Sequence, residues 1–337
     1  MSRRADTLIE SRFYHPDGAE TIRCELCPHR CVIAPGTTGF CGVRKNYGGE
    51  LQLPYYGAVS ALAVDPIEKK PLYHFYPGSD ILSVGFLGCN LRCPYCQNFR
   101  ISHGTTAQSR TMSPSALVSA ALDCGSFGIA YTYNEPTIHI EYLLEVATAA
   151  RKNGIKNVLV TAGNLNTEPA RELLALMDAV NLDLKSFDNE YYRRTLRADL
   201  SAVLEFARLT AERCHLEVTT LLVPGATDTE EEVHRIAQFV SDIDRSIPLH
   251  LSAYHPTPGY QTPPTPASTV HARAATARRY LYYVYTGNLG ERAETCCPGC
   301  GAILIRRMGL GARVLGLTPE GSCAGCGRRA EIVVRDD

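Results

Sequence analysis

The sequence predicts an α/β fold, a partial (β/α)6 barrel of the TIM type with a small cysteine-rich module at each end of the chain. Between residues 81 and 253, six short apolar runs alternate with longer amphipathic segments, which is the order of βαβ units that form a parallel sheet. Six units are too few for a closed eight-stranded barrel and suit an open one. A doubly wound open sheet is the alternative, and in either fold the functional groups lie at the carboxyl ends of the strands.

The predicted strands are short, rich in β-branched or aromatic residues, and bounded by Gly, Pro, Asn or Asp. They are ILSVGFL (81–87), GIAYTY (128–133), NVLVTA (157–162), AVNLDLK (179–185), LEVTTLLV (216–223) and PLHLSAY (248–254). The predicted helices between them are SPSALVSAALDCG, EYLLEVATAARKNG, NTEPARELLALMDA, LSAVLEFARLTAERC and DTEEEVHRIAQFVSDI. Ser113 and Asp228 are start signals for two of these helices, and Gly125 and Gly154 stand where C-terminal caps are expected.

The composition argues against several classes of protein. A formal net charge of -1 over 337 residues offers no broad basic surface for nucleic acid or for an anionic membrane. No apolar run approaches the roughly 18 residues of a membrane span, and the first residues, MSRRADTLIESRFYHPDG, lack the apolar core of a secretory signal. We therefore expect a cytoplasmic protein.

Fourteen cysteines in a chain that lacks a secretory signal point to metal ligands rather than disulfides, because the cytosol keeps thiols reduced. They form three groups: Cys24, Cys27, Cys31 and Cys41; Cys89, Cys93 and Cys96; and Cys296, Cys297, Cys300, Cys323 and Cys326. Cys124 and Cys214 stand alone, and we expect both to be small buried residues.

The middle group has the spacing C-x3-C-x2-C in GCNLRCPYCQNF (88–99), directly after the first predicted strand. Soft thiolates select iron–sulfur clusters and zinc. With only Cys89, Cys93 and Cys96 as ligands, one iron of a [4Fe–4S] cluster stays open, and an open position is the mark of a catalytic site. The alternative is a zinc knuckle that borrows His74 or His103.

This motif, after the first strand of a six-unit α/β array, resembles that of the radical S-adenosylmethionine (SAM) enzymes. The resemblance implies that SAM chelates the open iron through its amino and carboxylate groups. It also implies that the reduced cluster cleaves SAM to methionine and a 5′-deoxyadenosyl radical, which abstracts hydrogen from a substrate. In such enzymes the cofactor carries the difficult chemistry, while the protein binds, orients and excludes water.

The resemblance extends to residues that follow the second and third strands. Asn134 and Glu135 resemble part of the family's Gly-Gly-Glu segment, which meets the SAM amino group, although Tyr133 and Asn134 replace the glycines. An N-cap carboxylate is the alternative role for Glu135. Thr161 and Gly163 match the position that contacts the ribose and carboxylate region of SAM.

Further resemblances follow the fourth and sixth strands. Asp183 and Lys185 correspond to the Asp-x-Lys of pyruvate formate-lyase activating enzymes, with a structural salt bridge as the alternative. His255 matches a histidine that approaches SAM, and a solvent-exposed loop histidine is its alternative. The resemblance thus implies cofactor contacts at four strand ends.

The outer cysteine groups predict two further metal sites. Cys24, Cys27, Cys31 and Cys41 are spaced C-x2-C-x3-C-x9-C and suit either structural zinc or an auxiliary iron–sulfur cluster. Cys297, Cys300, Cys323 and Cys326 have the spacing of a zinc ribbon, with a hairpin of ILIRR and ARVLGL expected between the two pairs and Cys296 left outside. We expect an N-terminal cysteine-rich extension (1–78), the barrel (79–290) and a zinc-ribbon-like module (291–337).

Taken together, the motifs resemble one subgroup. CELCPHRC, VDPIEKKPLYHFYPG (64–78), GCNLRCPYCQNF, YTYNEPT, NLDLK, SAYHP and YVYTGN, followed by the ribbon, are similar to the radical SAM enzyme of the AmmeMemoRadiSam system, a relative of pyruvate formate-lyase activating enzymes. The resemblance implies Memo-like and AMMECR1-like companion proteins and an electron donor such as flavodoxin or ferredoxin. We expect residues 64–78 to be extended and to cover the mouth of the barrel.

Three functions agree with the sequence. The radical acts on an unknown small molecule or companion-bound intermediate, or it abstracts hydrogen from a glycine of a partner polypeptide, or the chain is a non-catalytic metal scaffold. The recurrence of SAM-site residues at several strand ends disfavours the scaffold. The motifs do not name the substrate.

Overall fold

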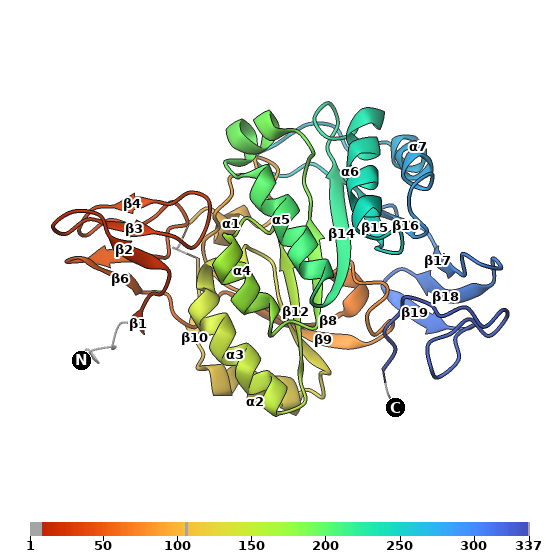
Figure 1. The fold of residues 1–337 in the computed structure, drawn as a ribbon, viewed down its shortest axis with the longest axis horizontal. Helices are drawn as coiled ribbons and strands as arrows, with labels where there is room; N and C mark the ends of the chain where they lie inside the picture. Colours follow the sequence, from red (N-terminus) through yellow and green to blue (C-terminus); the bar gives the residue numbers. More distant parts are fainter. Residues whose placement is uncertain (1–8, 105–106, 336–337) are drawn as a thin grey trace.

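A central sheet of eight strands forms the body of the protein in the computed structural model, which describes residues 9–104 and 107–335 (Figure 1). The strands are β8 (Ala61–Pro66), β9 (Asp80–Gly85), β11 (Gly128–Tyr131), β12 (Lys156–Thr161), β13 (Ala179–Asp183), β14 (His215–Leu222), β15 (Leu249–Ala253) and β16 (Val284–Gly287). The spatial order is β16-β15-β14-β13-β12-β11-β9-β8. All neighbours run parallel except β8, which is antiparallel to β9.

This sheet confirms the predicted partial barrel. The strands follow one another in space as in sequence, without the reversal of order that defines a doubly wound sheet, and the two edge strands do not pair with each other. The six predicted strands are confirmed, and β16 and β8 extend the sheet at its two edges. Because β8 lies within residues 1–78, the central sheet crosses the domain boundary predicted at residue 79.

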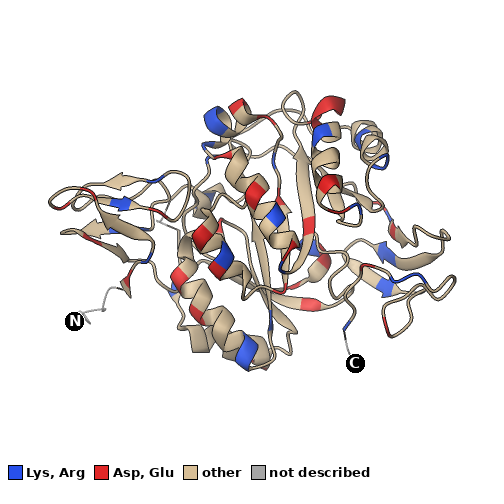
Figure 2. Ribbon diagram, in the orientation of Figure 1, with Lys and Arg blue, Asp and Glu red and all other residues tan. Residues whose placement is uncertain are grey.

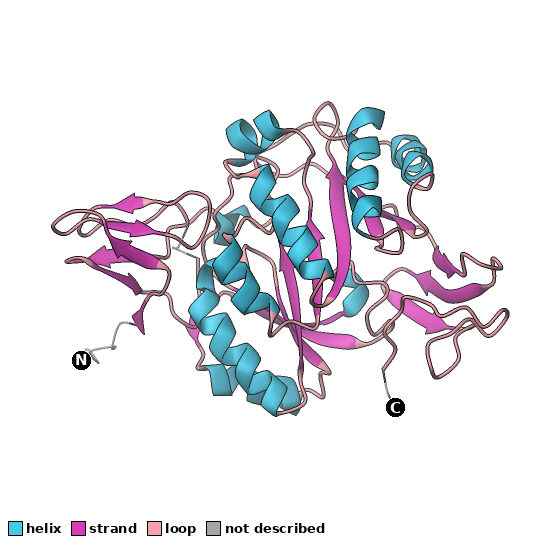
Figure 3. Ribbon diagram, viewed as in Figure 1, coloured by secondary structure: helices cyan, strands magenta, loops and turns pink. Residues whose placement is uncertain are grey.

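Helices cover the outer face of the sheet (Figure 3). They are α2 (Pro114–Asp123), α3 (Ile140–Lys152), α4 (Thr167–Leu174), α5 (Leu200–Ala211), α6 (Glu230–Ile243) and α7 (Ala267–Ala277). Ser113 caps α2 as predicted, since its Oγ accepts a hydrogen bond from the amide of Ala116. The predicted cap at Asp228 is wrong: Thr229 caps α6, while Asp228 accepts from the amide of Gly225 in the preceding turn.

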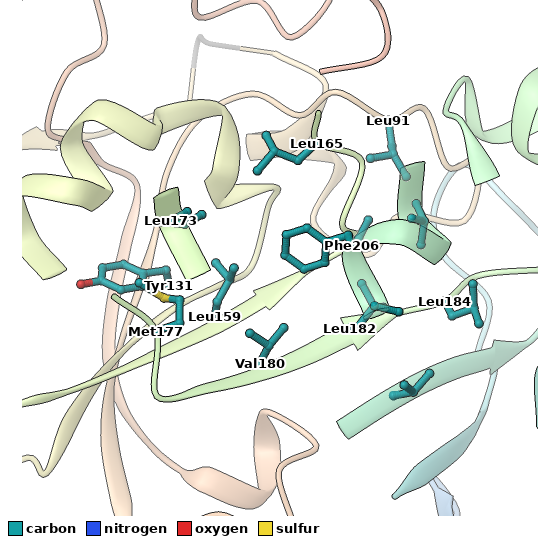
Figure 4. Close-up of a cluster of buried hydrophobic side chains, with 14 of the residues drawn as sticks. Leu91, Tyr131, Leu159, Leu165, Leu173, Met177, Val180, Leu182, Leu184 and Phe206 are labelled. Atoms are coloured by element: carbon teal, nitrogen blue, oxygen red, sulfur yellow. The ribbon is translucent and has the colours of Figure 1, made fainter. Parts of the chain in front are cut away.

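The sheet and the helices enclose a continuous apolar layer (Figure 4). Leu159, Val180 and Leu182 point outward from β12 and β13, where they meet Leu173 of α4 and Phe206 of α5. Each of these side chains is at most 1% exposed, and full burial of such a side chain contributes about 1.5–3 kcal/mol to stability. This layer fixes the positions of the strand ends that carry the polar residues.

Small sheets flank the barrel (Figure 1). The N-terminal module contains β1 (Ile9–Glu10), β6 (Glu50–Leu53) and β5 (Lys45–Tyr47) in one sheet, and β2 (Tyr14–Pro16), β3 (Ile22–Cys24) and β4 (Val32–Ile33) in another. A two-stranded pair joins β7 (Ala58–Val59) to β10 (Arg110–Thr111). The C-terminal module contains β17 (Ala293–Cys296), β18 (Ile303–Met308) and β19 (Gly311–Val314), and the hairpin of β18 and β19 confirms the one predicted.

The surface carries charges of both signs. Figure 2 shows Lys and Arg interspersed with Asp and Glu along the outer helices. Within residues 9–104 and 107–335, no helix combines the length and the apolar character that crossing a bilayer requires.

The prediction that both solitary cysteines are buried is wrong for Cys124, which is exposed at the end of α2, while Cys214 is half-buried.

The prediction that residues 64–78 cover the barrel mouth is wrong. Strand β8 runs antiparallel to β9, so the chain leaves it at the amino ends of the parallel strands, where Pro66 pairs with Asp80. A short 3-10 helix, η1 (Ile67–Lys69), follows. The amides of Tyr73 and His74 then donate to the carboxylate of Glu217 near the start of β14, at 3.0 and 2.7 Å. The segment therefore closes the end of the barrel opposite the predicted site.

A buried chain of hydrogen bonds connects this segment to the C-terminal module. Arg307 Nη1 donates to Thr295 Oγ1 at 2.8 Å, and Thr295 Oγ1 and the Tyr285 hydroxyl lie 2.7 Å apart. The Tyr285 hydroxyl is 2.7 Å from His74 Nε2, and His74 Nδ1 is 3.0 Å from the carbonyl of Glu331. Burial lowers the pKa of His74 to about 3, so its imidazole is neutral in this chain.

The pKa of His74 predicts a pH dependence of stability. The unfolded histidine binds a proton below its ordinary pKa of 6.5, whereas the folded one does so only near 3. Protons therefore bind preferentially to the unfolded state between these values, and the free energy of unfolding falls as the pH drops through this window, by up to about 1.4 kcal/mol per pH unit for this group. We expect His74→Gln to be less stable at pH 7 and to have a flatter pH dependence than the wild type.

Thermal unfolding of both proteins between pH 7 and pH 5 measures this difference. His15→Gln, which changes an exposed histidine, serves as the matched control and is expected to keep the wild-type slope. Parallel slopes for His74→Gln and the wild type would contradict the role given to His74.

Candidate functional site

The loop between β9 and the short helix α1 (Phe99–Ser102) carries three cysteine thiols at the carboxyl edge of the sheet. Cys93 is buried, and Cys89 and Cys96 are half-buried. Burial raises the pKa of Cys89, and the charges of Glu135, Cys93 and Cys96 raise it further. Glu135 follows β11, which neighbours β9 in the sheet, so it lies at the same carboxyl edge as the three cysteines.

Hydrogen bonds from several elements hold this loop. The amide of Gly88 donates to the carbonyl of Ile101 at 2.7 Å, and the amide of Arg92 donates to the carbonyl of Leu196 at 2.8 Å, at the end of a π-helix, η3 (Tyr191–Leu196). The Arg92 guanidinium also donates to the carbonyls of Cys89, Leu91 and Phe40, at 2.9, 2.7 and 2.6 Å. The backbone around the thiols is therefore fixed.

Asn134 anchors the start of the loop. Its Oδ1 accepts from the amide of Phe86 at 3.0 Å, and its Nδ2 donates to the carbonyl of Gly88 at 2.8 Å. The preceding Tyr133 has a φ of 72°, the left-handed region that favours glycine, and this accounts for a glycine in the family motif at this place. Asn134 thus positions the cysteine loop, and its predicted contact with SAM stays a prediction.

Glu135 links the ends of β11 and β12. Its carboxylate accepts hydrogen bonds from Thr161 Oγ1 at 2.6 Å, from the amide of Ala162 at 2.8 Å, and from the hydroxyl and amide of Thr137 at 2.7 and 3.2 Å. The last bond caps the 3-10 helix η2 (Pro136–His139), which is the alternative role that the sequence left open. Contact of Glu135 or Thr161 with SAM remains a prediction.

Gly163 is fixed by packing as well as by its backbone. Its φ is 67°, and a Cβ atom at this position would lie 2.7 Å from Leu182 Cδ1 and 3.0 Å from Phe206 Cδ1. Its amide donates to Thr161 Oγ1 at 3.0 Å. A side chain here would therefore disturb both the turn and the apolar layer beneath it.

Asp183 and Lys185 form an ion pair at the carboxyl end of β13. Lys185 Nζ lies 3.1 Å from Asp183 Oδ2. Burial alone would lower the pKa of Lys185, but the charges of Asp183 and Cys93 outweigh it and raise this pKa, so the ammonium stays charged. The pair is a salt bridge, and its place at the end of β13 also puts it at the carboxyl edge that carries the cysteine loop.

His255 follows β15 on an exposed loop. Its Nε2 is 3.1 Å from the carbonyl of Asn288, just beyond β16. The structure therefore places it at the same edge of the sheet as the cysteine loop, tied to the next strand end and exposed. Its approach to SAM stays a prediction.

The structure excludes His74, one of the two histidines that could complete a zinc knuckle. Both ring nitrogens of His74 are hydrogen-bonded at the amino end of the barrel, opposite the cysteine loop. His103 directly follows α1 and lines a pocket with Cys41 and Arg92.

Several residues that position the site were not predicted from the sequence. Arg92 lies inside the cysteine motif, and this position is the one sequence feature that could have identified it as a residue that positions the loop. Asn90 is fully buried, and its carbonyl lies 2.9 Å from His29 Nε2 of the N-terminal module. Tyr133 extends past Gly85 and donates its hydroxyl to Asp65 Oδ2 at 2.5 Å, a contact between distant segments that no local pattern indicates.

Comparison with known proteins agrees with this geometry. Residues 84–240 match the radical SAM superfamily, and this range contains the cysteine loop and most of the strand ends described above. The chain is 40% identical over 336 residues to an uncharacterized protein of Methanocaldococcus jannaschii, covering 96% of this chain and 99% of the relative. This chain belongs to the radical SAM superfamily.

Other relatives are more distant. The radical SAM region is 27% identical over 177 residues to pyruvate formate-lyase 1-activating enzyme of Escherichia coli K12, covering 50% of this chain and 72% of that enzyme. The crystal structure of Streptococcus suis SuiB bound to S-adenosylmethionine superposes with a TM-score of 0.50 at 14% identity, over 66% of this chain and 54% of that one. The second likeness shows a shared fold.

Four thiols in the C-terminal module form a compact group apart from the radical SAM loop. The Sγ atoms of Cys297, Cys300, Cys323 and Cys326 all lie within 4.8 Å of one another. Cys297 and Cys326 are 3.6 Å apart, as are Cys300 and Cys323. A tetrahedral ion with metal–sulfur bonds of about 2.3 Å places its sulfur ligands about 3.8 Å apart, so this group fits one metal ion.

The role of Asn134 gives a prediction. Asn134→Ala removes two hydrogen bonds that fix the loop, each worth about 1 kcal/mol, while leaving the three cysteines in place. We expect the variant to lose iron to a chelator several-fold faster than the wild type. Gln97→Ala changes an exposed residue of the same loop and is expected to retain iron like the wild type. Equal iron loss from Asn134→Ala and Gln97→Ala would contradict the anchoring role.

Proposed function

We propose that this chain is a radical SAM enzyme in which Cys89, Cys93 and Cys96 hold a [4Fe–4S] cluster and SAM binds at the open iron. One observation carries the proposal: Cys89, Cys93 and Cys96 stand on one loop at the carboxyl edge of a partial barrel, and hydrogen bonds fix this loop from several sides. The soft donor set fits an iron–sulfur cluster. When bound, the reduced cluster supplies the electron that cleaves SAM to a 5′-deoxyadenosyl radical, which takes hydrogen from the substrate.

The residues around the thiols have separate tasks in this proposal. The Lys185 ammonium, next to Cys93, offsets the negative charge of a thiolate-ligated cluster. Asp183 keeps that ammonium in place, and Glu135 and Thr161 hold the neighbouring strand ends at a fixed distance. We propose that Asn134, Glu135, Thr161, Gly163, Asp183, Lys185 and His255 together form the wall against which SAM binds.

The barrel interior beneath the loop is filled by charged and aromatic groups. Tyr133 occupies the space beside Gly85, and Lys70 Nζ lies 4.5 Å from the centre of its ring. Lys70 also pairs with Asp65 at 2.7 Å, so each buried charge has a partner. This filling supports a site that excludes water from below, as radical chemistry requires.

The similarity to pyruvate formate-lyase 1-activating enzyme favours a second candidate function, the activation of a partner polypeptide by removal of hydrogen from a glycine. Under both candidates we propose an external one-electron donor such as flavodoxin or ferredoxin and a cytoplasmic location. We also propose Memo-like and AMMECR1-like companions, on the resemblance of the motifs. A glycyl doublet in the electron paramagnetic resonance (EPR) spectrum of such a partner selects this second candidate.

SAM cleavage tests the proposed function. Anaerobic protein with a full cluster is incubated with SAM and dithionite, and 5′-deoxyadenosine is measured by chromatography. We expect product from the wild type and none from Cys93→Ala, because that variant leaves the cluster without one of its three thiolates. Cys124→Ala, an exposed cysteine outside the three groups, should retain full activity. A fully loaded wild-type protein that forms no 5′-deoxyadenosine would refute both enzymatic candidates.

We further propose that Cys297, Cys300, Cys323 and Cys326 bind structural zinc. The C-terminal module has a small apolar core, which includes Leu304, Ile305 and Ile332, so a metal ion is expected to supply much of its stability.

Cys300→Ala tests the zinc proposal. We expect it to remove zinc and to lower the free energy of unfolding of the module by several kcal/mol, on the order of a structural zinc site. Cys296→Ala, an exposed neighbour outside the group, should keep both zinc and stability. Metal analysis and thermal unfolding provide the two readouts. A Cys300→Ala protein with a full zinc content would contradict the assignment.

A further inference from the structure

Four cysteines of the N-terminal module surround one cavity next to the radical SAM loop. Cys24 ends β3, while Cys27 and Cys31 lie in the turn before β4, and Cys41 lies in the loop before β5. All four line the cavity. Ile138 of η2, from the barrel, closes it on another side. The cavity therefore forms where the N-terminal module meets the radical SAM domain.

The spacing of these thiols differs from that of the C-terminal group. Among residues 9–104 and 107–335, only the C-terminal cysteines form a set of three or more ligand atoms that all lie within 4.8 Å of one another. No three of the four N-terminal Sγ atoms meet that limit, and neither do those of the radical SAM loop. Zinc requires its sulfur ligands about 3.8 Å apart. A [4Fe–4S] cluster gives each thiolate its own iron, so it accepts thiols that stand further apart.

A buried arginine beside these cysteines has an unused donor. Arg44 is 1% exposed and lines the cavity. Its terminal nitrogens are bonded to Glu141, at 2.7 and 3.1 Å, and to the carbonyl of Arg12 at 2.7 Å. Its Nε has no hydrogen-bond partner in the described part of the chain. A buried donor without an acceptor costs about 1–3 kcal/mol, so a group that accepts a hydrogen bond from this atom would stabilise the protein.

The two cysteine loops are in direct contact. A Cβ atom on Gly88 would lie 2.5 Å from the carbonyl oxygen of Cys41, so only glycine allows the backbones to approach this closely. Arg92 donates to the carbonyl of Phe40 at 2.6 Å and stacks on its ring at 4.0 Å. The N-terminal module is thus attached to the chain next to Cys89.

We propose that Cys24, Cys27, Cys31 and Cys41 hold a second [4Fe–4S] cluster, directly beside the loop of the radical SAM cluster. The thiol spacing, the unpartnered Arg44 Nε and the shared cavity carry this assignment. Four protein thiolates leave no iron open, so this cluster would not bind SAM, and Arg44 Nε would be the donor available to its sulfur atoms. This assignment concerns cysteines other than Cys89, Cys93 and Cys96, so it can be right or wrong independently of the proposed SAM chemistry.

A variant that lacks the radical SAM cluster isolates the second site. The full chain with Cys89, Cys93 and Cys96 all changed to Ala is purified anaerobically after reconstitution with iron and sulfide in the presence of zinc. Iron, sulfide and zinc are measured per chain, and the iron is examined by Mössbauer spectroscopy. We expect about four irons with the Mössbauer signature of a [4Fe–4S] cluster and about one zinc. About two zinc ions and no iron would overturn the proposal.

Single substitutions in the otherwise unchanged chain provide a second measurement that does not depend on the triple variant. Cys27→Ala is expected to lower the iron content from about eight to about four per chain, while Cys124→Ala leaves it unchanged. A wild-type protein with about four irons that still forms 5′-deoxyadenosine would refute the second cluster and leave the proposed function intact. A protein with about eight irons that forms no 5′-deoxyadenosine would refute the proposed function and leave the second cluster intact.

Discussion

The hydrogen bonds and the backbone contact that fix the cysteine loop to its neighbours are the constraint on which the rest of the site depends. Three thiols on a free loop would not hold a cluster in one place, because ordering each residue costs about 1–2 kcal/mol of backbone entropy. Here Asn134 holds the start of the loop, Arg92 holds its middle, and the backbones of Gly88 and Cys41 are in contact. Barrel and N-terminal module both contribute, so neither part alone fixes the thiols.

Much of the barrel could be predicted because its signals are local. Runs such as NVLVTA and LEVTTLLV carry the composition of buried parallel strands, and Gly125 and Gly154 have the positive φ that a helix end requires. Because functional groups of such folds lie at the carboxyl ends of the strands, the sequence alone predicts that Glu135, Asp183 and the three cysteines lie at one edge of the sheet. The match to the radical SAM superfamily agrees with this arrangement.

The features that escaped prediction depend on contacts between distant segments. Residues 64–78 were expected to cover the mouth of the barrel, but the amides of Tyr73 and His74 donate to the carboxylate of Glu217, more than 140 residues away in the sequence, and this holds the segment at the opposite end. The hydrogen bonds by which Asn134 and Glu135 join neighbouring loops and strands were not predicted, while their contact with SAM stays a prediction. The role of Arg44 likewise depends on Glu141 of α3, which no spacing rule relates to the N-terminal cysteines.

The central claim is that Cys89, Cys93 and Cys96 bind three irons of a [4Fe–4S] cluster and that SAM binds the fourth, open iron. Electron–nuclear double resonance on the reduced protein, with SAM labelled with nitrogen-15 in its amino group, tests this directly. We expect a hyperfine coupling between the cluster and the labelled nitrogen, which is lost when Cys93 is changed to Ala. A reduced cluster with a full iron content and no coupling to bound SAM would contradict the account.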